Sequence, residues 1–173
     1  LGCYGYQRPT SPALDAFARE SVVFEQAESA SPWTAPALIS LVTSLYPDVH
    51  RVYHFPNPRR MSARATTLAE ILKEHGYATA AFTEGGYAKG EFGLDQGFDV
   101  FPANPGDDDS NESNMTNPCR LEYNLRLALA LLGSERRRPR FLLFHTYEVH
   151  DPLRVPDEFV SIFRPGWVAA AAY

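Results

Sequence analysis

Two groups of side chains in this sequence have the types and the spacing needed to act on an anionic ester. The first is the hydroxyl of Thr34, which lies between a loop-like stretch at 29–33 and a run with helical spacing. A hydroxyl at the N-cap of a helix lies among unpaired backbone N–H groups and at the positive end of the helix dipole. Those groups favour an alkoxide together with an anionic ester, so Thr34 suits nucleophilic attack on phosphate or sulfate. Local sequence alone favours the alternative, a threonine that only caps its helix.

The second group follows the most continuous apolar run of the sequence, Phe141–Phe144. It consists of four polar residues: His145, Glu148, His150 and Asp151. Histidines at this spacing could donate to an anionic oxygen, protonate a leaving group or bind a metal. On spacing alone, a surface loop of ordinary polar residues explains them better. His50, in a proline-rich loop, is a weaker candidate of the same kind.

The elements that must hold these groups alternate between helical and β-like patterns. Apolar residues repeat at helical spacing over Ala35–Leu45, with Thr34 as the predicted N-cap. A capping box formed by Thr67 and Glu70 begins the next helix, and Gly76 ends it. The sequence therefore predicts one helix directly after Thr34 and a second helix that leads into a strand.

Two β-like runs predict the strands of this arrangement. Tyr77–Phe82 follows the capped helix, and Phe141–Tyr147 follows a predicted helix at Leu121–Leu132. Helices and strands in this order predict an α/β fold in which one largely parallel sheet carries helices on its faces. Ligands bind at the carboxyl edge of such sheets, which is where His145 and His150 are then expected.

The start of the chain carries a helix signal followed by a strand signal. Ser11 is a predicted N-cap and Pro12 a first helical residue, a position where the missing N–H of proline costs nothing. The run Val22–Phe24 predicts a short, buried strand.

Composition narrows the possible classes of protein. The chain has 173 residues, of which 45% are hydrophobic and 21% charged, as in ordinary globular proteins. Its net charge of −5 argues against a general nucleic-acid binder. No apolar run of the sequence approaches the roughly 18 residues of a membrane span. Cys3 and Cys119 are too few for a disulfide scaffold and lack zinc-ligand spacing, so the redox compartment stays undecided.

Several segments match, in order, the motifs of one enzyme family. In the first half of the chain, LGCYGY at 1–6 and RPTSPALDAFA at 8–18 match the motifs LGxYGY and TPNLDxLA, and FEQA at 24–27 matches FxxA. The segment SPWTAPALISLVTSLYP at 31–47 matches the nucleophile motif CxPSRxSLLTGxYP, and His50 matches the His-Gly pair that follows that motif. Further along, GLDQGFD at 93–99 matches a GFD landmark and FHTYEVHDP at 144–152 matches an HxxxPHxPY-type segment. This series resembles the sulfatase family of the alkaline phosphatase superfamily and covers most of the chain.

The resemblance implies a three-layer α/β/α domain with a mostly parallel sheet, present here as a single partial domain over 1–173. It implies that the intact parent cleaves a sulfate or phosphate ester, on a small or polymeric substrate, with a divalent metal ion (Ca, Mg, Mn or Zn). Thr34 would be the metal-bound nucleophile, and His150 would contact the substrate anion or the leaving group. His50 and His145 are second-rank candidates for substrate binding. The family resemblance also implies a periplasmic or other extracytoplasmic location.

The sequence departs from the family pattern at positions that matter for chemistry. The nucleophile position holds Thr34 instead of the Cys or Ser that is oxidised to formylglycine, so formylglycine is not expected. The motif's arginine is Leu38, and residues 84–86 replace the Lys and His that many sulfatases carry before the GFD landmark. Threonine nucleophiles occur in relatives that transfer phosphoryl groups, such as phosphoethanolamine transferases. A phosphoryl transferase, or a degenerate module that only binds anionic glycans or lipid head groups, is therefore the alternative.

The ends of the sequence predict a fragment of a larger chain. In the family, one pair of metal-binding Asp residues precedes the LGxYGY segment, and an Asp-His or Asp-Asn pair lies beyond the point where this sequence stops. Of the residues that touch the metal, the resemblance leaves only Thr34. This chain on its own is therefore expected to be inactive.

Overall fold

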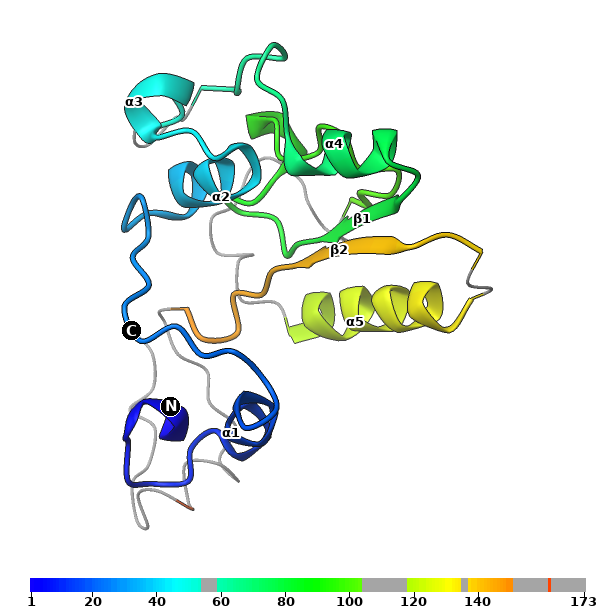
Figure 1. Cartoon of the computed structure of the whole chain (residues 1–173). Helices are drawn as coiled ribbons and strands as arrows, with labels where there is room; N and C mark the ends of the chain where they lie inside the picture. The colour runs from blue at the N-terminus through cyan, green and yellow to red at the C-terminus, as the bar shows by residue number, and fades with distance from the viewer. Residues whose placement is uncertain (54–58, 104–117, 135–136, 151–161, 163–173) are drawn as a thin grey trace. The chain divides into compact units, whose positions relative to one another are not determined.

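The computed structural model describes residues 1–53, 59–103, 118–134, 137–150 and 162 (Figure 1). They belong to two compact units, Leu1–Ala30 and Ser31–Tyr173. Unit 1 contains a 3-10 turn, η1 (Gly2–Tyr4), and one helix, α1 (Pro12–Ala18). Ser11 is the N-cap of α1 and Pro12 its first residue, as the sequence predicts. The Asp15 carboxylate joins the helix to the turn, because it accepts hydrogen bonds from the Cys3 N–H at 2.8 Å and the Ser11 hydroxyl at 3.1 Å.

The strand predicted at Val22–Phe24 is wrong. These residues form no strand, and the side chains of Val22 and Phe24 are 83% and 71% exposed. A strand has to pair its backbone groups with a neighbouring strand, and the described residues of unit 1 contain none.

The second unit is built on a two-stranded parallel sheet. Strand β1 (Ala78–Phe82) pairs with β2 (Arg140–Phe144) in a register that runs from Ala78 opposite Arg140 to Phe82 opposite Phe144. The predicted parallel pairing is confirmed, although β2 ends at Phe144 and not at Tyr147. The last ladder bond goes from the His145 N–H to the Phe82 carbonyl at 2.9 Å. Beyond it the chain bends toward Glu84, which lies two residues after β1.

Helices cover both faces of this sheet. One side carries α2 (Thr34–Thr43), the single turn α3 (Pro47–His50) and α4 (Leu68–Glu74), and the other side carries α5 (Pro118–Gly133) (Figure 1). A short 3-10 turn, η2 (Gly90–Phe92), lies in the connection after β1. The arrangement is the three-layer α/β/α architecture that the sequence predicts.

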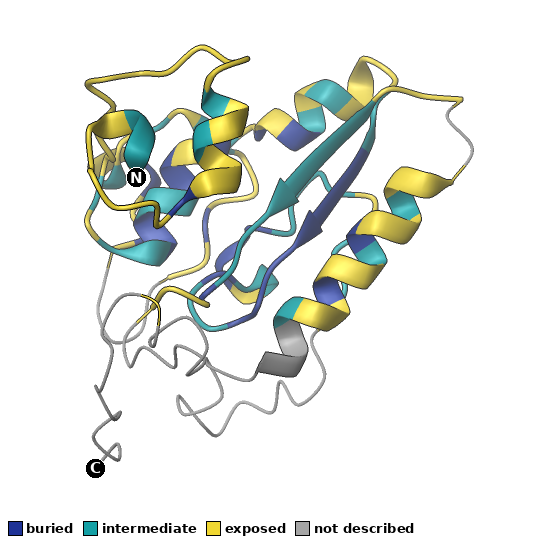
Figure 2. Cartoon of the chain, turned by 90° about the horizontal axis from the view of Figure 1, so that it is seen from below, coloured by how far each residue is buried: buried dark blue, intermediate teal, exposed yellow. Residues whose placement is uncertain are grey.

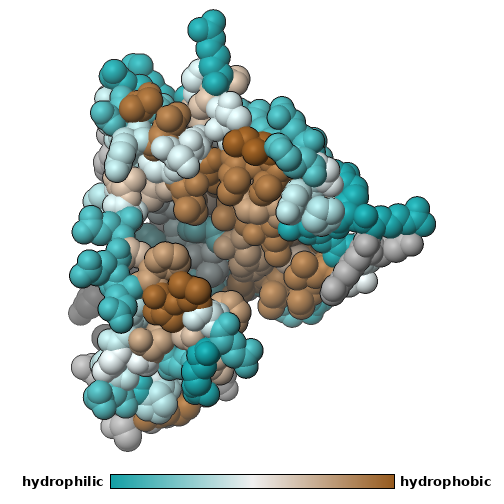
Figure 3. Space-filling view, in the orientation of Figure 1, coloured by the Kyte–Doolittle hydropathy of each residue, from teal (hydrophilic) through white to brown (hydrophobic). Residues whose placement is uncertain are grey.

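Side chains along the strands alternate between the two faces of the sheet, so each face has its own hydrophobic core. Phe82 and Ala80 pack with Ala128 of α5, while Ile39 and Val42 of α2 belong to a second core on the opposite face. Figure 2 shows that α5 turns its buried residues toward the sheet and its exposed residues away from it. All residues of β2 are half-buried, and Figure 3 shows hydrophobic side chains at the surface in the region of the sheet.

Helix α4 begins and ends as its sequence predicts. The Thr67 hydroxyl accepts from the Glu70 N–H at 3.1 Å, and the Glu70 carboxylate accepts from the Thr67 N–H at 2.8 Å, which completes the capping box. Gly76 takes a φ of 85° just after the helix. A left-handed backbone costs little only for glycine, so Gly76 turns the chain into β1.

Candidate functional site

The segments that follow the two parallel strands lie at the same edge of the sheet. Glu84 lies two residues after β1, and its side chain is almost fully buried, with the residue 2% exposed. One of its carboxylate oxygens accepts from the Thr146 hydroxyl at 2.7 Å, and the other accepts from the Tyr147 N–H at 2.8 Å. These two bonds draw the segment after β2 toward the segment after β1, and so account for the end of β2 at Phe144.

Tyr147 connects this edge to helix α2. The residue is 3% exposed, and its hydroxyl oxygen accepts from the Tyr87 N–H at 3.2 Å. The hydroxyl also shares a hydrogen bond with the Thr34 side chain. Burial raises the pKa of the Tyr147 phenol above its usual range, and the hydrogen bond with Thr34 offsets part of that rise. Tyr147 is therefore a neutral phenol packed against the first residue of α2.

Thr34 is the first residue of α2 and not its N-cap, which corrects the sequence prediction. The N-cap is Trp33, whose backbone is extended at φ −125° and ψ 142° and whose carbonyl accepts from the Ala37 N–H at 3.1 Å. The Thr34 hydroxyl, one position inside the helix, turns to Tyr147. It still lies in the first turn, where backbone N–H groups have no partner within the helix.

His145 and His150 both pack on the Tyr147 ring. The two imidazoles meet the phenol ring edge-on, with centroids 4.7 Å away for His145 and 5.3 Å away for His150. His145 is half-buried, and among the described residues its buried Nδ1 has no hydrogen-bond partner. Burial holds the pKa of His145 below its ordinary value, the charge of Glu84 opposes this shift, and His150 adds to it. His150 is exposed, and its N–H donates to the Tyr147 carbonyl at 2.8 Å.

Three predicted site residues therefore meet at one side chain. Thr34, His145 and His150 each contact Tyr147, although more than a hundred positions of sequence separate Thr34 from the two histidines. Glu148 lies exposed in the same segment, with its N–H donating to the Thr146 hydroxyl at 3.1 Å. Asp151 lies outside the described residues.

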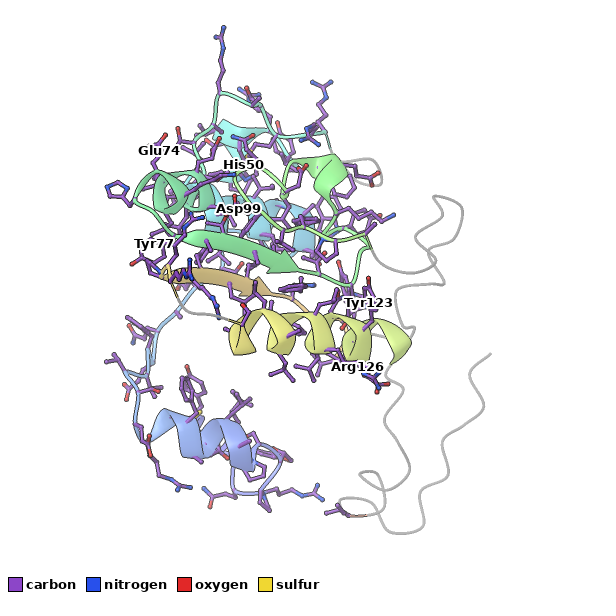
Figure 4. The ribbon with its side chains drawn as sticks, turned by 90° about the vertical axis from the view of Figure 1, so that its right-hand side faces the viewer. His50, Glu74, Tyr77, Asp99, Tyr123 and Arg126 are labelled. Carbon is purple, nitrogen blue, oxygen red and sulfur yellow. The ribbon has the colours of Figure 1, made fainter. Side chains whose placement is uncertain are left out.

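His50 has its partners elsewhere in the chain. It is the last residue of α3, is 6% exposed, and its Nδ1 accepts from the Val52 N–H at 3.0 Å. Its Nε2 lies 3.0 Å from the Ser40 hydroxyl of α2. Burial lowers the pKa of His50, and a hydrogen bond with the Pro36 backbone opposes that shift. His50 thus ties α3 to α2 through Nε2, while its Nδ1 accepts from Val52 just after α3; Figure 4 labels His50.

A cavity opens beside the segment that follows β1. It has a volume of about 390 Å³ and is lined by Thr83 and Gly85, which flank Glu84 in sequence, and by Lys89, Phe98 and Phe101 among others. Its wall combines aromatic rings with charges of both signs, because Glu91 and Asp95 line it together with Lys89.

The described residues alone do not form a metal centre. Among them, no three His, Cys, Asp or Glu side chains lie together in a way that could hold a metal ion. Thr34 is the one predicted ligand present, and a single hydroxyl does not fit a divalent cation, which needs several oxygen or nitrogen ligands.

In the part of the chain that the structure describes, no helix is long and apolar enough to cross a membrane.

Sequence reasoning missed Glu84 and Tyr147 as members of the site. The position of Glu84 just beyond a predicted strand could have indicated it, because the same position is the reason for expecting His145 and His150 at the carboxyl edge. Tyr147 carried no comparable signal, because a tyrosine between polar residues fits a surface loop equally well. Its burial depends on contacts with Glu84 and Thr34 that are remote in sequence.

Comparisons with known proteins found one matching family model and several similar proteins. The family model described as Sulfatase matches residues 1–166. Mouse (Mus musculus) iduronate 2-sulfatase is 38% identical over 80 residues, which are 46% of this chain and 14% of that protein. Mouse steryl-sulfatase is 36% identical over 89 residues, again 46% of this chain and 14% of that protein.

A solved structure is similar as well. The phosphonate monoester hydrolase of Agrobacterium radiobacter superposes with a TM-score of 0.67 at 19% identity, over 91% of this chain and 40% of that one. At this identity the likeness shows the fold alone. The chain therefore spans less than half of the length of each of these relatives.

Proposed function

The chain belongs to the sulfatase family, and on that premise we propose that the intact protein cleaves a sulfate or phosphate ester with Thr34 as the nucleophile. The fold is part of the alkaline phosphatase-like α/β/α domain. The observation that supports the proposal is the meeting of Thr34, His145 and His150 at Tyr147, on the carboxyl edge of the sheet. A plain helix cap and an unrelated loop would have no reason to converge there.

Each residue has a distinct part in the proposed reaction. Thr34 Oγ1 forms a bond to the sulfur or phosphorus atom as the ester bond breaks, and its proton passes to solvent. The exposed His150 contacts the anion or gives a proton to the departing alcohol oxygen. Water then releases the sulfate or phosphate from Thr34. The cavity beside the segment after β1 offers room for the alcohol part of the substrate.

His145 and His50 are second candidates for substrate contacts. The unpartnered Nδ1 of His145 leaves that nitrogen available. His50 would have to give up its bonds with Val52 and Ser40 before either ring nitrogen could reach a ligand, so it ranks below His145.

The metal and the compartment also belong to the proposal. A divalent ion (Ca, Mg, Mn or Zn) would supply charge at the attacked ester, but its further ligands would have to come from outside the described residues, and we assign no step to it. Formylglycine is not part of the proposal, because the γ-methyl group of threonine prevents oxidation of its side chain to an aldehyde. We place the intact protein outside the cytoplasm on the family resemblance.

Substitution of Thr34 in the intact protein tests the nucleophile. Thr34→Ala should lower turnover of sulfate or phosphate esters by several orders of magnitude, because it removes the atom that attacks. Thr34→Ser keeps a hydroxyl and is the matched control. The free energy of unfolding should fall by about 1 kcal/mol in Thr34→Ala, the usual net value of one hydrogen bond, and by less in Thr34→Ser. Near-native turnover in Thr34→Ala would rule out this role for Thr34.

The same assay separates the alternative functions. A non-catalytic module would bind sulfate or phosphate without turnover and without dependence on Thr34. A phosphoryl transferase would pass the group to an added alcohol in preference to water, and product analysis would identify the new ester.

A further inference from the structure

The buried carboxylate of Glu84 holds two consecutive residues of the segment after β2. The Thr146 hydroxyl donates to one of its oxygens at 2.7 Å, and the Tyr147 N–H donates to the other at 2.8 Å. Hydrogen bonds to a carboxylate are short and about twice as strong as those between neutral groups. The chain after β2 is therefore fixed to the chain after β1 by a side chain that is almost fully buried.

The same two residues hold the turn that follows them. The Thr146 hydroxyl, which donates to Glu84, accepts from the Glu148 N–H at 3.1 Å. The Tyr147 carbonyl accepts from the His150 N–H at 2.8 Å, which closes a turn over Tyr147–His150. The imidazole of His150 then meets the Tyr147 ring edge-on, with centroids 5.3 Å apart. A continuous series of printed contacts thus runs from the Glu84 carboxylate to the backbone of His150.

This turn contributes little to the hydrophobic core. Among its residues only Tyr147 is buried, while Glu148 and His150 are exposed and Val149 is 84% exposed. A buried carboxylate costs free energy unless hydrogen bonds replace those that it made with water. In this protein the replacing bonds order an exposed turn. The residue that gains a fixed place at the surface by this arrangement is His150.

We propose that Glu84 is a positioning residue, which fixes the turn Tyr147–His150 so that the His150 imidazole reaches the ester. The proposal rests on the proposed function, in which His150 contacts the anion or the departing alcohol oxygen. Glu84 itself does not touch the substrate and acts through the two residues that it holds. A displacement of about 1 Å at a reacting group can cost about 100-fold in rate, so the place of the turn matters for turnover.

Glu84→Gln in the intact protein tests this role. The amide keeps the size of the side chain but replaces one acceptor oxygen with a donor group, so it cannot accept from both Thr146 and Tyr147. We expect kcat/KM to fall about 10-fold. Glu70→Gln is the matched control, because the Glu70 carboxylate also accepts from a backbone N–H and a hydroxyl, both of Thr67, at 2.8 and 3.1 Å. It should leave kcat/KM unchanged.

A double-mutant cycle with His150 separates positioning from a general loss of structure. His150→Ala removes the group that Glu84 is proposed to place. Glu84→Gln should therefore lower kcat/KM about 10-fold in the wild type and less than about twofold in a His150→Ala background. Equal losses in the two backgrounds would assign Glu84 to stability alone and overturn the positioning role. A His150→Ala protein with the kcat/KM of the wild type would overturn it too.

Amide hydrogen exchange measured by NMR adds a readout that does not depend on turnover. The N–H groups of Glu148 and His150 belong to exposed residues, and the bonds within the turn protect them. In Glu84→Gln their exchange should become about 10-fold faster, because the turn opens more often, whereas Glu70→Gln should leave it unchanged. Unchanged exchange at both amides in Glu84→Gln would show that the turn does not depend on Glu84.

Thr146→Val gives the same tests if Glu84→Gln folds poorly. It removes the hydroxyl that connects Glu84 with the Glu148 N–H and keeps the shape of the side chain. Because the bond of Tyr147 to Glu84 remains, we expect a smaller fall in kcat/KM, about threefold, with faster exchange at Glu148. No change in either quantity would count against the proposal.

These experiments distinguish a failure of the positioning role from a failure of the proposed function. If Thr34→Ala keeps its turnover, the proposed function fails and the positioning role fails with it. If Thr34→Ala is inactive but the losses from Glu84→Gln and His150→Ala multiply, only the positioning role fails.

Discussion

The two ends of strand β1 use polar side chains in opposite ways. At its start, Lys73 pairs with Asp99 at 2.7 Å, and the same carboxylate accepts from the Thr79 N–H at 3.2 Å. The Arg138 guanidinium closes this end by donating to the carbonyl of Tyr77 at 2.6 Å. At the other end, the buried Glu84 is held by a hydroxyl and an N–H, and the Nδ1 of His145 has no partner among the described residues. Figure 4 labels Tyr77 and Asp99 at the first of these ends.

This difference predicts that one end of the sheet serves stability and the other serves the proposed function. The hydrogen bond from Lys73 lowers the pKa of Asp99, so the fold favours the charged form at the start of β1. Burial lowers the pKa of His145, so the fold disfavours the charged form at the carboxyl end. Groups held in an unfavourable state are typical of sites that act on a ligand. The contrast predicts that substitutions at the carboxyl end alter activity and those at the start alter only stability.

Glu84→Ala should have the largest effect of the substitutions that test this contrast. It leaves the Thr146 hydroxyl and the buried Tyr147 N–H without an acceptor, at a cost of about 1–3 kcal/mol for each group. The Tyr147 segment would shift, and we expect kcat to fall at least about 100-fold. Thermal unfolding and steady-state kinetics measure the two effects. Glu84→Gln, which keeps one carbonyl oxygen, should fall between the wild type and Glu84→Ala.

Glu70→Ala is the matched control in α4, the helix that leads into the start of β1. Glu70 also accepts from a backbone N–H, that of Thr67, and from a side chain, that of Gln96 at 2.9 Å. Its loss should cost about 1 kcal/mol of stability through the capping box and leave kcat unchanged. Equal losses of kcat in Glu70→Ala and Glu84→Ala would remove the distinction between the two ends.

The start of the sheet was also the part that sequence predicts well. The capping box, the glycine stop and the parallel pairing of the two strands follow from local patterns, because each depends on residues close in sequence or on a long apolar run. The strand predicted at Val22–Phe24 does not form, because the described residues of unit 1 contain no neighbouring strand to pair with it. A local sequence pattern cannot show whether such a neighbour is present. Thr34 was misplaced by one position as an N-cap, because its hydroxyl bonds with Tyr147, more than a hundred residues away.

His50 offers a further test of the comparison between the two ends of the sheet. The sequence predicted it as a site residue, but its ring nitrogens are bonded within the chain, as the polar groups at the start of the sheet are. His50→Ala would leave the Val52 N–H and the Ser40 hydroxyl unpaired, so we expect a loss of about 1–3 kcal/mol in the free energy of unfolding. We expect a smaller change in KM, since both ring nitrogens are engaged within the chain. A large rise in KM without loss of stability would instead assign His50 to substrate binding.

Asp99→Asn should have the smallest effect and a defined dependence on pH. The Lys73–Asp99 pair is partly exposed, with side-chain exposures of 47% and 33%, so its loss at neutral pH should cost no more than about 1 kcal/mol. The folded protein lowers the pKa of Asp99, so the pair stabilises the fold above the unfolded pKa and loses that contribution as the pH falls through the folded pKa. Wild type and Asp99→Asn should therefore differ in thermal stability at pH 7 and converge in strong acid, with kcat equal at pH 7. Asp95→Asn, which removes the exposed Arg60–Asp95 pair, is the control for loss of a surface ion pair. A stability gap that persists unchanged in strong acid would show that Asp99 acts through packing and not through its charge.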